Sequence, residues 1–176
     1  GGFPGGLGRF TLDTISEATP LRILASGGSV PVQDLFFGRT GGCLGDTAAL
    51  LLILGGVYIV WKKVANYRIV AGVLSGFLVM NGSLWLAGLT FDPLRGLLAG
   101  GFLLGAFFMA TDPVSAAQTN KGRWIYGILI GILAVLIRVF SSWPEGIMFA
   151  ILLGNMFAPI IDYTLSAQKR KEGRHA

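Results

Sequence analysis

The sequence has little of the side-chain chemistry that most enzymes use. It contains one cysteine, Cys43, and one histidine, His175, which lies in the polar C-terminal tail. A single cysteine excludes a disulfide within the chain and any metal cluster held by several cysteines. The sequence shows no Ser-His-Asp arrangement, P-loop, zinc-ligand spacing or dinucleotide-binding glycine motif. A chain of this kind requires a cofactor or a partner to carry out a reaction.

Charge is also scarce. Charged residues make up 13% of the 176 residues and apolar residues 53%. Together with long apolar runs, this balance is typical of membrane proteins. The net charge of +5 comes from basic residues in short connections and in the tail, so orientation in a membrane explains it better than nucleic-acid binding. The 27 glycines follow no collagen repeat. Glycine pairs that favour close packing within one helix bundle recur at Gly72/Gly76, Gly101/Gly105 and Gly127/Gly131.

A polar N-terminal segment precedes five apolar stretches. We expect short helices near residues 19–26 and 31–38 of that segment. A membrane helix needs about 17–25 residues, and lipid forces the backbone to satisfy its own hydrogen bonds. The sequence therefore predicts an all-α membrane protein, a bundle of about five transmembrane helices preceded by an extracytoplasmic segment. The apolar stretches cover about 47–61, 69–89, 94–110, 124–140 and 147–165, and the predicted domains are 1–44, 45–165 and the basic tail 166–176.

Basic residues follow every second apolar stretch. The positive-inside rule places these connections and the C-terminus in the cytoplasm. With five spans, the N-terminal segment that contains Thr19 then faces outside. The basic residues are Lys62, Lys63 and Arg68 after the first stretch, Lys121 and Arg123 after the third, and Lys169, Arg170, Lys171 and Arg174 after the fifth.

Three acidic residues lie at the ends of predicted spans. Asp46 opens the first span, Asp112 ends the third, and Asp162 lies near the inner end of the fifth, three residues after Pro159. These acids are explained by helix capping and interfacial charge, or by a cation path lined with oxygen ligands. Both interpretations remain open. Arg138, late in the fourth span, either extends outward to the interface or pairs with Glu145.

A set of motifs in the second half of the chain resembles a known family. The family is that of the B subunit of the Na⁺-translocating NADH:quinone reductase and its paralogue, the D subunit of the Rnf complex. The resemblance covers nearly all of residues 13–165. Because the family protein has two related halves, and because the sequence begins without methionine, we expect this chain to be the second half of a longer subunit. The matching motifs are residues 108–116, 136–139, 144–146, 148–152, Asn155 and residues 158–162.

The resemblance implies a covalently attached flavin. Ser16-Glu17-Ala18-Thr19 matches the family's flavinylation motif Ser-Gly-Ala-Thr, in which FMN is joined through its phosphate to the threonine hydroxyl. Carried over, Thr19 is the acceptor, and Ser16 and Ala18 complete the motif. In the family, a separate flavin transferase attaches FMN outside the cytoplasm, which agrees with the predicted orientation. Glu17 stands where the family has glycine. The resemblance also suggests riboflavin as a second flavin cofactor.

The resemblance also implies a function. An electron-transfer subunit of the bacterial inner membrane would pass electrons from NADH, through neighbouring subunits and FMN, to quinone, coupled to Na⁺ transport. Asp46, in Gly45-Asp46-Thr47 where the family has Gly-Glu-Thr, is the first candidate on the Na⁺ pathway, with Asp112 and Asp162. The chain holds no NADH site of its own. The alternatives are the Rnf-type D subunit of a ferredoxin:NAD⁺ oxidoreductase, a non-redox cation transporter or channel, and a structural half-subunit.

Overall fold

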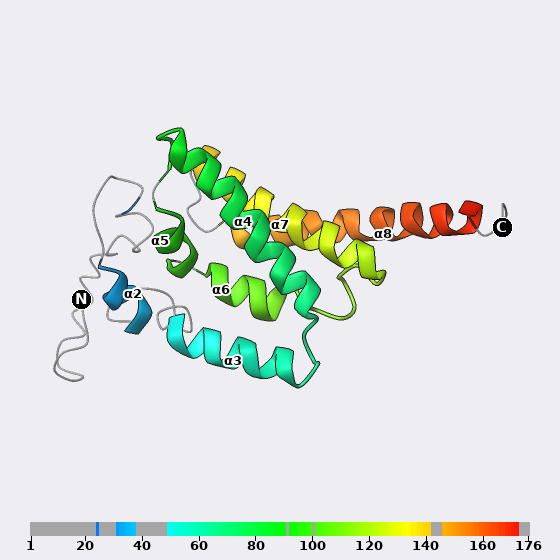
Figure 1. Ribbon diagram of the computed structural model, residues 1–176, viewed down its shortest axis with the longest axis horizontal. Helices are drawn as coiled ribbons and strands as arrows, with labels where there is room; N and C mark the ends of the chain where they lie inside the picture. Colours follow the sequence, from blue (N-terminus) through cyan, green and yellow to red (C-terminus); the bar gives the residue numbers. More distant parts are fainter. Residues whose placement is uncertain are drawn as a thin grey trace, which may run out of the picture.

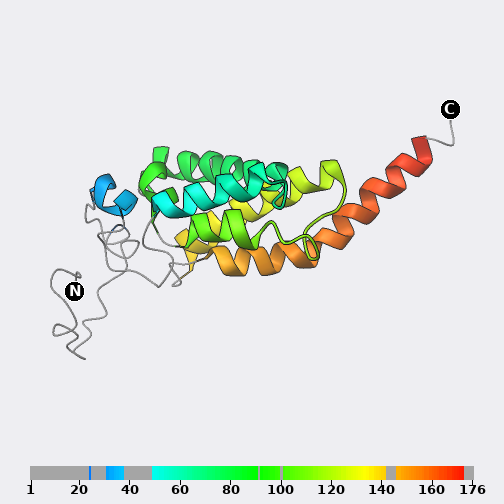
Figure 2. The same cartoon turned by 90° about the horizontal axis from the view of Figure 1, so that it is seen from below.

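The described part of the chain is entirely helical apart from its connections. The computed structural model describes residue 24 and residues 31–37, 49–90, 92–99, 101–141 and 146–172, and these contain no strand. The helices lie side by side in one bundle, and the C-terminal end of α8 extends clear of the others in both views (Figures 1 and 2). The elements are α2 Val32–Phe37, α3 Ala49–Trp61, α4 Tyr67–Leu86, α5 Pro93–Leu98, α6 Phe102–Leu104, the π-helix η2 Gly105–Met109, α7 Asn120–Phe140 and α8 Ile147–Glu172.

Three helices are long and apolar enough to cross a membrane. They are α4, α7 and residues Ile147–Ala167 of α8, which confirms the second, fourth and fifth predicted spans. The first predicted span forms α3, whose 13 described residues extend about 20 Å at 1.5 Å per residue. That length is shorter than a hydrocarbon core of about 30 Å. The predicted basic tail begins within α8, which continues to Glu172.

The third apolar stretch is not the single continuous helix that its composition predicts. It is divided into α5, α6 and η2. The helix stops after Leu98, because Ala99 adopts an extended conformation with φ −91° and ψ 135°. The following sequence, Gly100-Gly101, has a low helix propensity. The π-helix then closes with a hydrogen bond of 2.8 Å from Ala110 N to Gly105 O, five residues earlier.

Glycines bring α4 and α7 into backbone contact. A Cβ atom placed on Gly76 would lie 2.6 Å from the carbonyl oxygen of Ile128, and one on Gly131 would lie 2.4 Å from that of Val73. Gly72 and Gly127 meet in the same way, with 3.1 Å between the added Cβ of Gly72 and the Cα of Gly127. These distances exclude any side chain at the contact. The predicted packing role of the two glycine pairs within one bundle is therefore confirmed.

Aromatic side chains fill the centre of the bundle. The rings of Phe77 and Phe102 lie 4.1 Å apart between centroids, and both side chains are fully buried. The buried Tyr126 hydroxyl donates a hydrogen bond of 2.6 Å to Asn155 Oδ1, which joins α7 to α8. Large apolar side chains cover the outside of the spanning helices, among them Val79, Leu86, Met156, Ile160 and Tyr163. Such a surface is suited to lipid rather than to water.

Candidate functional site: the two ends of the bundle

Arg138 of α7 donates hydrogen bonds to the backbone where the third apolar stretch is interrupted. Its guanidinium donates to the carbonyl oxygen of Gly96 at 2.6 Å and more weakly to that of Ala99 at 3.4 Å. It also lies over the rings of Phe77 and Phe102, 5.5 and 5.9 Å from their centroids. The last carbonyls of a helix have no donor within that helix, so Arg138 supplies donors to the end of α5. Arg138 thus turns toward the bundle, and Glu145 lies outside the described residues.

The N-terminal segment packs at this same end of the bundle. Leu24 and Leu35 are buried in one cluster with Ala99, and Leu98 packs against it. Leu35 belongs to α2, which confirms the helix predicted near residues 31–38. The interruption after α5 is therefore covered by residues that precede the first apolar stretch. Four predicted site residues lie outside the described part of the chain, and they are Ser16, Ala18, Thr19 and Asp46.

Two buried donors near the interruption have no hydrogen-bond partner among the described residues. They are Nδ2 of Asn81 on α4 and Nε of Arg95 on α5. Asn81 is 2% exposed, and an unpaired buried amide costs about 1–3 kcal/mol. Arg95 lies 4.0 Å from Asp92, the residue that caps α5. The sequence interpretation missed both donors. An asparagine within an apolar span was the available signal, because polar groups in spans are costly.

At the opposite end of the bundle, Asp162 ties α8 to the start of α7. Its carboxylate accepts hydrogen bonds from the backbone N–H of Gln118 at 2.6 Å, the backbone N–H of Thr119 at 3.0 Å and the Thr119 hydroxyl at 2.6 Å. Thr119 in turn caps α7 by accepting from the N–H of Gly122 at 3.1 Å. Gly122 leaves room for this arrangement, because an added Cβ would lie 2.7 Å from Asp162 Oδ1.

Asp112 forms a separate turn in the connection between η2 and α7. Its carboxylate accepts from the Ser115 hydroxyl at 2.7 Å, the Ser115 N–H at 3.2 Å and the Val114 N–H at 3.3 Å. The Ser115 hydroxyl, followed by the Val114 N–H, holds the pKa of Asp112 below its ordinary value. Asp112 and Asp162 therefore lie on the same side of the bundle, as the sequence predicts, but each carboxylate has its own set of donors.

The acids do not converge on one metal centre. In the part of the chain that the structure describes, no three histidine, cysteine, aspartate or glutamate side chains are placed to hold a metal ion. A carboxylate has about four acceptor positions, and three are occupied on each acid. Pro159 lies within α8, as expected. Because proline lacks an N–H, the carbonyl of Asn155 loses its helical donor. This end of the bundle offers scattered oxygen atoms rather than a closed metal site.

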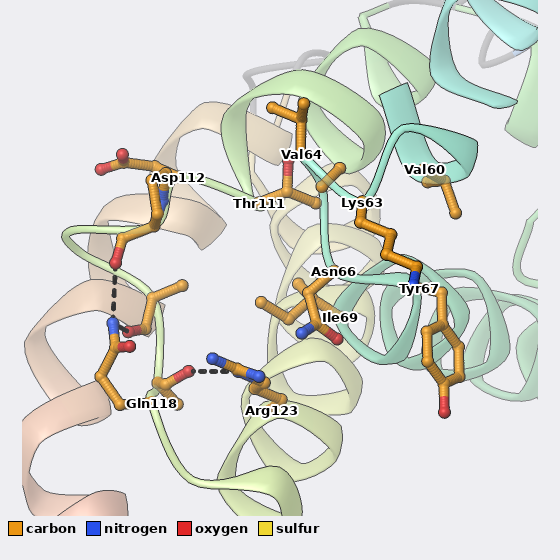
Figure 3. Close-up of a pocket in the computed structure, with 14 residues that line it drawn as sticks. Val60, Lys63, Val64, Asn66, Tyr67, Ile69, Thr111, Asp112, Gln118 and Arg123 are labelled. Carbon is orange, nitrogen blue, oxygen red and sulfur yellow. Dashed lines mark hydrogen bonds between the residues drawn. The ribbon is translucent and has the colours of Figure 1, made fainter. Parts of the chain in front are cut away.

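A cavity of about 390 Å³ opens beside Asp112. It lies between the α3–α4 connection, the connection that follows η2, and the first turn of α7. Figure 3 shows Lys63 and Arg123 on one side of it and Asp112 and Gln118 on the other. The sequence interpretation treated Lys63 and Arg123 only as markers of orientation. Only the tertiary structure brings these residues to one cavity, because Lys63 lies in the α3–α4 connection and Arg123 in the first turn of α7.

The helices, the apolar exterior and the interrupted third stretch define a multi-pass helical membrane protein. Within that class, the chain belongs to the NQR2, RnfD, RnfE family, whose model matches residues 2–171.

Curated relatives cover most of this chain. A protein of Ectopseudomonas mendocina is 43% identical over 166 residues, covering 86% of this chain and 41% of the relative. A protein of Klebsiella pneumoniae strain 342 is 42% identical over 182 residues, covering 92% and 44%. One of Neisseria meningitidis serogroup B is 41% identical over 166 residues, covering 89% and 40%. Each of these relatives is named as the B subunit of the Na(+)-translocating NADH-quinone reductase. The chain spans about two fifths of their length.

Proposed function

We propose that this chain is an electron-transfer part of a Na⁺-translocating NADH:quinone reductase of the bacterial inner membrane. The observation that carries the proposal is the 43% identity over 86% of the chain to a relative named as the B subunit of that enzyme. The neighbouring subunits supply NADH oxidation, quinone is the electron acceptor, and the lipid bilayer surrounds the spans. The chain is not catalytically complete alone.

FMN is proposed to be attached through its phosphate to the hydroxyl of Thr19, in the motif with Ser16 and Ala18. The flavin supplies one- and two-electron transfer when it is bound. Two features of the chain support this role. Leu24, five residues after Thr19, is buried at the interrupted end of the bundle, and five residues extend at most about 18 Å. The Nδ2 of Asn81, on α4, is buried and has no hydrogen-bond partner among the described residues, and it suits an acceptor oxygen of a flavin.

The attachment is tested by flavin fluorescence in a denaturing gel. A fluorescent band at the mass of the chain is expected in the unmodified protein and in Thr14→Ala, a threonine outside the motif. The band should be lost in Thr19→Ala. Glu17→Gly, which restores the family motif, should keep or raise the band intensity. A band that persists in Thr19→Ala, or one that is absent from the unmodified protein, rejects the attachment.

Na⁺ transport is proposed to involve Asp46, Asp112 and Asp162. Carboxylate and carbonyl oxygens are the ligands that hard cations prefer, and Asp112 and Asp162 each keep one acceptor position beyond the three hydrogen bonds described above. In this proposal the two acids bind the ion transiently from separate positions, and the protein's hydrogen bonds fix the direction of each carboxylate. The basic end of the bundle and the C-terminus face the cytoplasm by the positive-inside rule.

The Rnf-type D subunit is the second candidate, because the matching family model includes both types of subunit. Under that candidate the flavin remains on Thr19, and the electron donor of the complex is ferredoxin in place of NADH. Activity of the purified complex with NADH and quinone, measured against activity with reduced ferredoxin and NAD⁺, separates the two. A cation transporter without redox chemistry predicts no flavin absorbance at all.

A further inference from the structure

The cavity beside the α3–α4 connection contains cationic groups without direct partners. Among the described residues, the Lys63 ammonium and the two terminal guanidinium nitrogens of Arg123 make no hydrogen bond or ion pair, and Asp162 attracts Arg123 only at longer range. Arg123 is held in place by its Nε, which donates to the carbonyl oxygen of Ala117 at 3.2 Å. Both cations line the cavity, and an anion can therefore enter without displacing an existing contact.

The acid in the cavity wall, Asp112, forms no ion pair with either cation among the described residues. The Asp112 carboxylate is engaged by Ser115 and Val114, and it points away from Lys63 and Arg123 in Figure 3. Gln118 is likewise fixed, because its Nε2 donates to the carbonyl oxygens of Pro113 at 2.7 Å and Ala116 at 3.0 Å. Asn66 and Tyr67 add neutral polar groups to the lining, and the charged groups without a direct partner among the described residues are the two cations.

The rest of the lining is apolar, and the surroundings are typical of a membrane interface. Val60, Val64, Ala65 and Ile69 line the cavity together with the cations. Trp61, which follows the lining residue Val60 in the sequence, is 77% exposed, and the ammonium of Lys62 lies 5.6 Å from the centroid of the Trp61 ring. Exposed tryptophan and tyrosine next to lysine mark the level of the lipid head groups.

We propose that this cavity binds the phosphate-bearing head group of an anionic phospholipid. The phosphate lies between Lys63 and Arg123, and the glycerol region with the first chain carbons lies against the valine side chains. A volume of about 390 Å³ is in the range of small-molecule sites, about 300–1,000 Å³, and is larger than a lone inorganic anion needs. Basic pockets between membrane helices bind phospholipid head groups in this manner. The site requires neither flavin nor Na⁺.

Native mass spectrometry of the detergent-purified protein, in the assembly in which it is isolated, tests the proposal. Phosphatidylglycerol and phosphatidylcholine of the same chain length are added together, so that they compete for the protein. The variants are Lys63→Asn and Arg123→Gln, and the matched controls outside the cavity are Lys62→Asn and Lys121→Gln. We expect preferential retention of phosphatidylglycerol in the unmodified protein and both controls. Each cavity variant should bind it about fivefold more weakly, since one basic residue near a lipid surface contributes about a factor of this size.

Asparagine is chosen to replace Lys63 because it is compatible with the backbone conformation there, so that weaker lipid binding is not caused by misfolding. Lys63 has φ +58°, a left-handed conformation that asparagine adopts more readily than lysine. A thermal midpoint equal to that of the unmodified protein, measured without added lipid, confirms that the variant is folded. Equal retention of phosphatidylglycerol in the cavity variants and the controls overturns the proposal. Displacement of phosphatidylglycerol by millimolar inorganic phosphate also overturns it, in favour of a free-phosphate site. Retention of phosphatidylcholine at the same level as phosphatidylglycerol overturns it as well, because the site then does not select for the negative charge of the lipid.

Discussion

A single carboxylate, that of Asp162, connects α8 to the start of α7. Replacing it by asparagine in Asp162→Asn removes the charge and one acceptor oxygen, and it leaves the donors of Gln118 and Thr119 with a weaker partner. The expected loss is about 1–2 kcal/mol of unfolding free energy, because hydrogen bonds to charged groups contribute about 1.5–3 kcal/mol and this one is partly solvated. Thermal unfolding followed by intrinsic fluorescence in detergent measures the change.

A double-mutant cycle with Thr119→Val separates this tie from a role in Na⁺ transport. The two substitutions should be non-additive in stability, because both act on the same hydrogen bond. If Asp162 handles Na⁺, then Asp162→Asn alters the Na⁺ dependence of quinone reduction more than Thr119→Val does. The same Na⁺ dependence in the two variants rejects the transport role of Asp162 and leaves the structural one.

The Asp112 turn predicts a specific dependence of stability on pH. The Ser115 hydroxyl and the Val114 N–H lower the pKa of Asp112 below its ordinary value of 3.8. The ionised turn therefore stabilises the folded state fully above that ordinary value, and this stabilisation is lost as the pH falls through the lowered pKa. Ser115→Ala raises the pKa of Asp112 toward its ordinary value.

Thermal midpoints at pH 7 and near pH 3 check this prediction. Ser115→Ala should lower the midpoint at pH 7 and have a smaller effect at the acidic pH, where the carboxylate is increasingly protonated in both proteins. Ser83→Ala is the matched control, because the Ser83 hydroxyl donates within its own helix to the carbonyl of Met80 at 2.8 Å. An equal effect of Ser115→Ala at the two pH values contradicts the role of the Asp112 charge.

Helices α4 and α7 depend on glycine where their backbones touch. Gly131→Ala places a Cβ 2.4 Å from the carbonyl oxygen of Val73, and that backbone atom cannot move aside cheaply. We expect a loss of about 1–3 kcal/mol in unfolding free energy, the usual cost of overpacking. Gly82→Ala on α4 is the control, because an added Cβ there meets nothing within 4 Å. That substitution should be neutral or stabilising by up to about 1 kcal/mol. Similar thermal midpoints for the two variants contradict the packing described here.

The interruption between α5 and α6 depends on Arg138. Arg138→Met keeps the apolar stem and removes the donors to the carbonyl oxygens of Gly96 and Ala99. Backbone amides of residues 93–104 should then exchange with deuterium faster, because the end of α5 loses its cap. Arg138→Lys should restore only part of the protection, because an ammonium does not reproduce the fork of donors that guanidinium offers. Hydrogen exchange of α8 peptides provides the internal reference, and unchanged exchange in residues 93–104 contradicts this role.

The orientation of the whole molecule is tested with its one cysteine. The positive-inside rule puts Cys43 outside and the C-terminal tail in the cytoplasm. A membrane-impermeant maleimide should therefore label Cys43 in intact spheroplasts. The matched variant Cys43→Ala with Ser166→Cys should react only after the membrane is permeabilised. The reverse pattern overturns the orientation and, with it, the attachment of flavin outside the cytoplasm.

The sequence predicted the long elements well and the irregular ones poorly. Apolar length identifies α4 and α7, and the four-residue glycine spacing predicts close packing within the bundle, because both signals are local and periodic. The contact of these two helices with each other was not predicted. The division of the third stretch was missed, because Gly100-Gly101 lowers helix propensity only modestly. The end of α5 also depends on the Arg138 guanidinium from α7, and the sequence of residues 94–110 contains no information about that contact.

For Asp112 and Asp162, the sequence likewise predicted the general position but not the contacts. Their position on one side of the bundle followed from counting spans. Their separate hydrogen-bond sets did not, because Asp162 finds its partners at Gln118 and Thr119, more than 40 residues away in the sequence. The cavity beside Lys63 was missed for a related reason. Basic residues in connections were interpreted by their number, whereas their common cavity depends on how the connections fold over the ends of the helices.

The backbone contact between α4 and α7 also restricts how the length of the chain can change. Gly72 and Gly76 meet Gly127 and Gly131 only at one rotation and one height of the two helices. One inserted residue turns the following part of a helix by about 100°, so an insertion between the glycines of either pair moves one glycine off the shared face and puts a larger residue there. Insertions and deletions should therefore be excluded from the segments 72–76 and 127–131 in working relatives and confined to the connections.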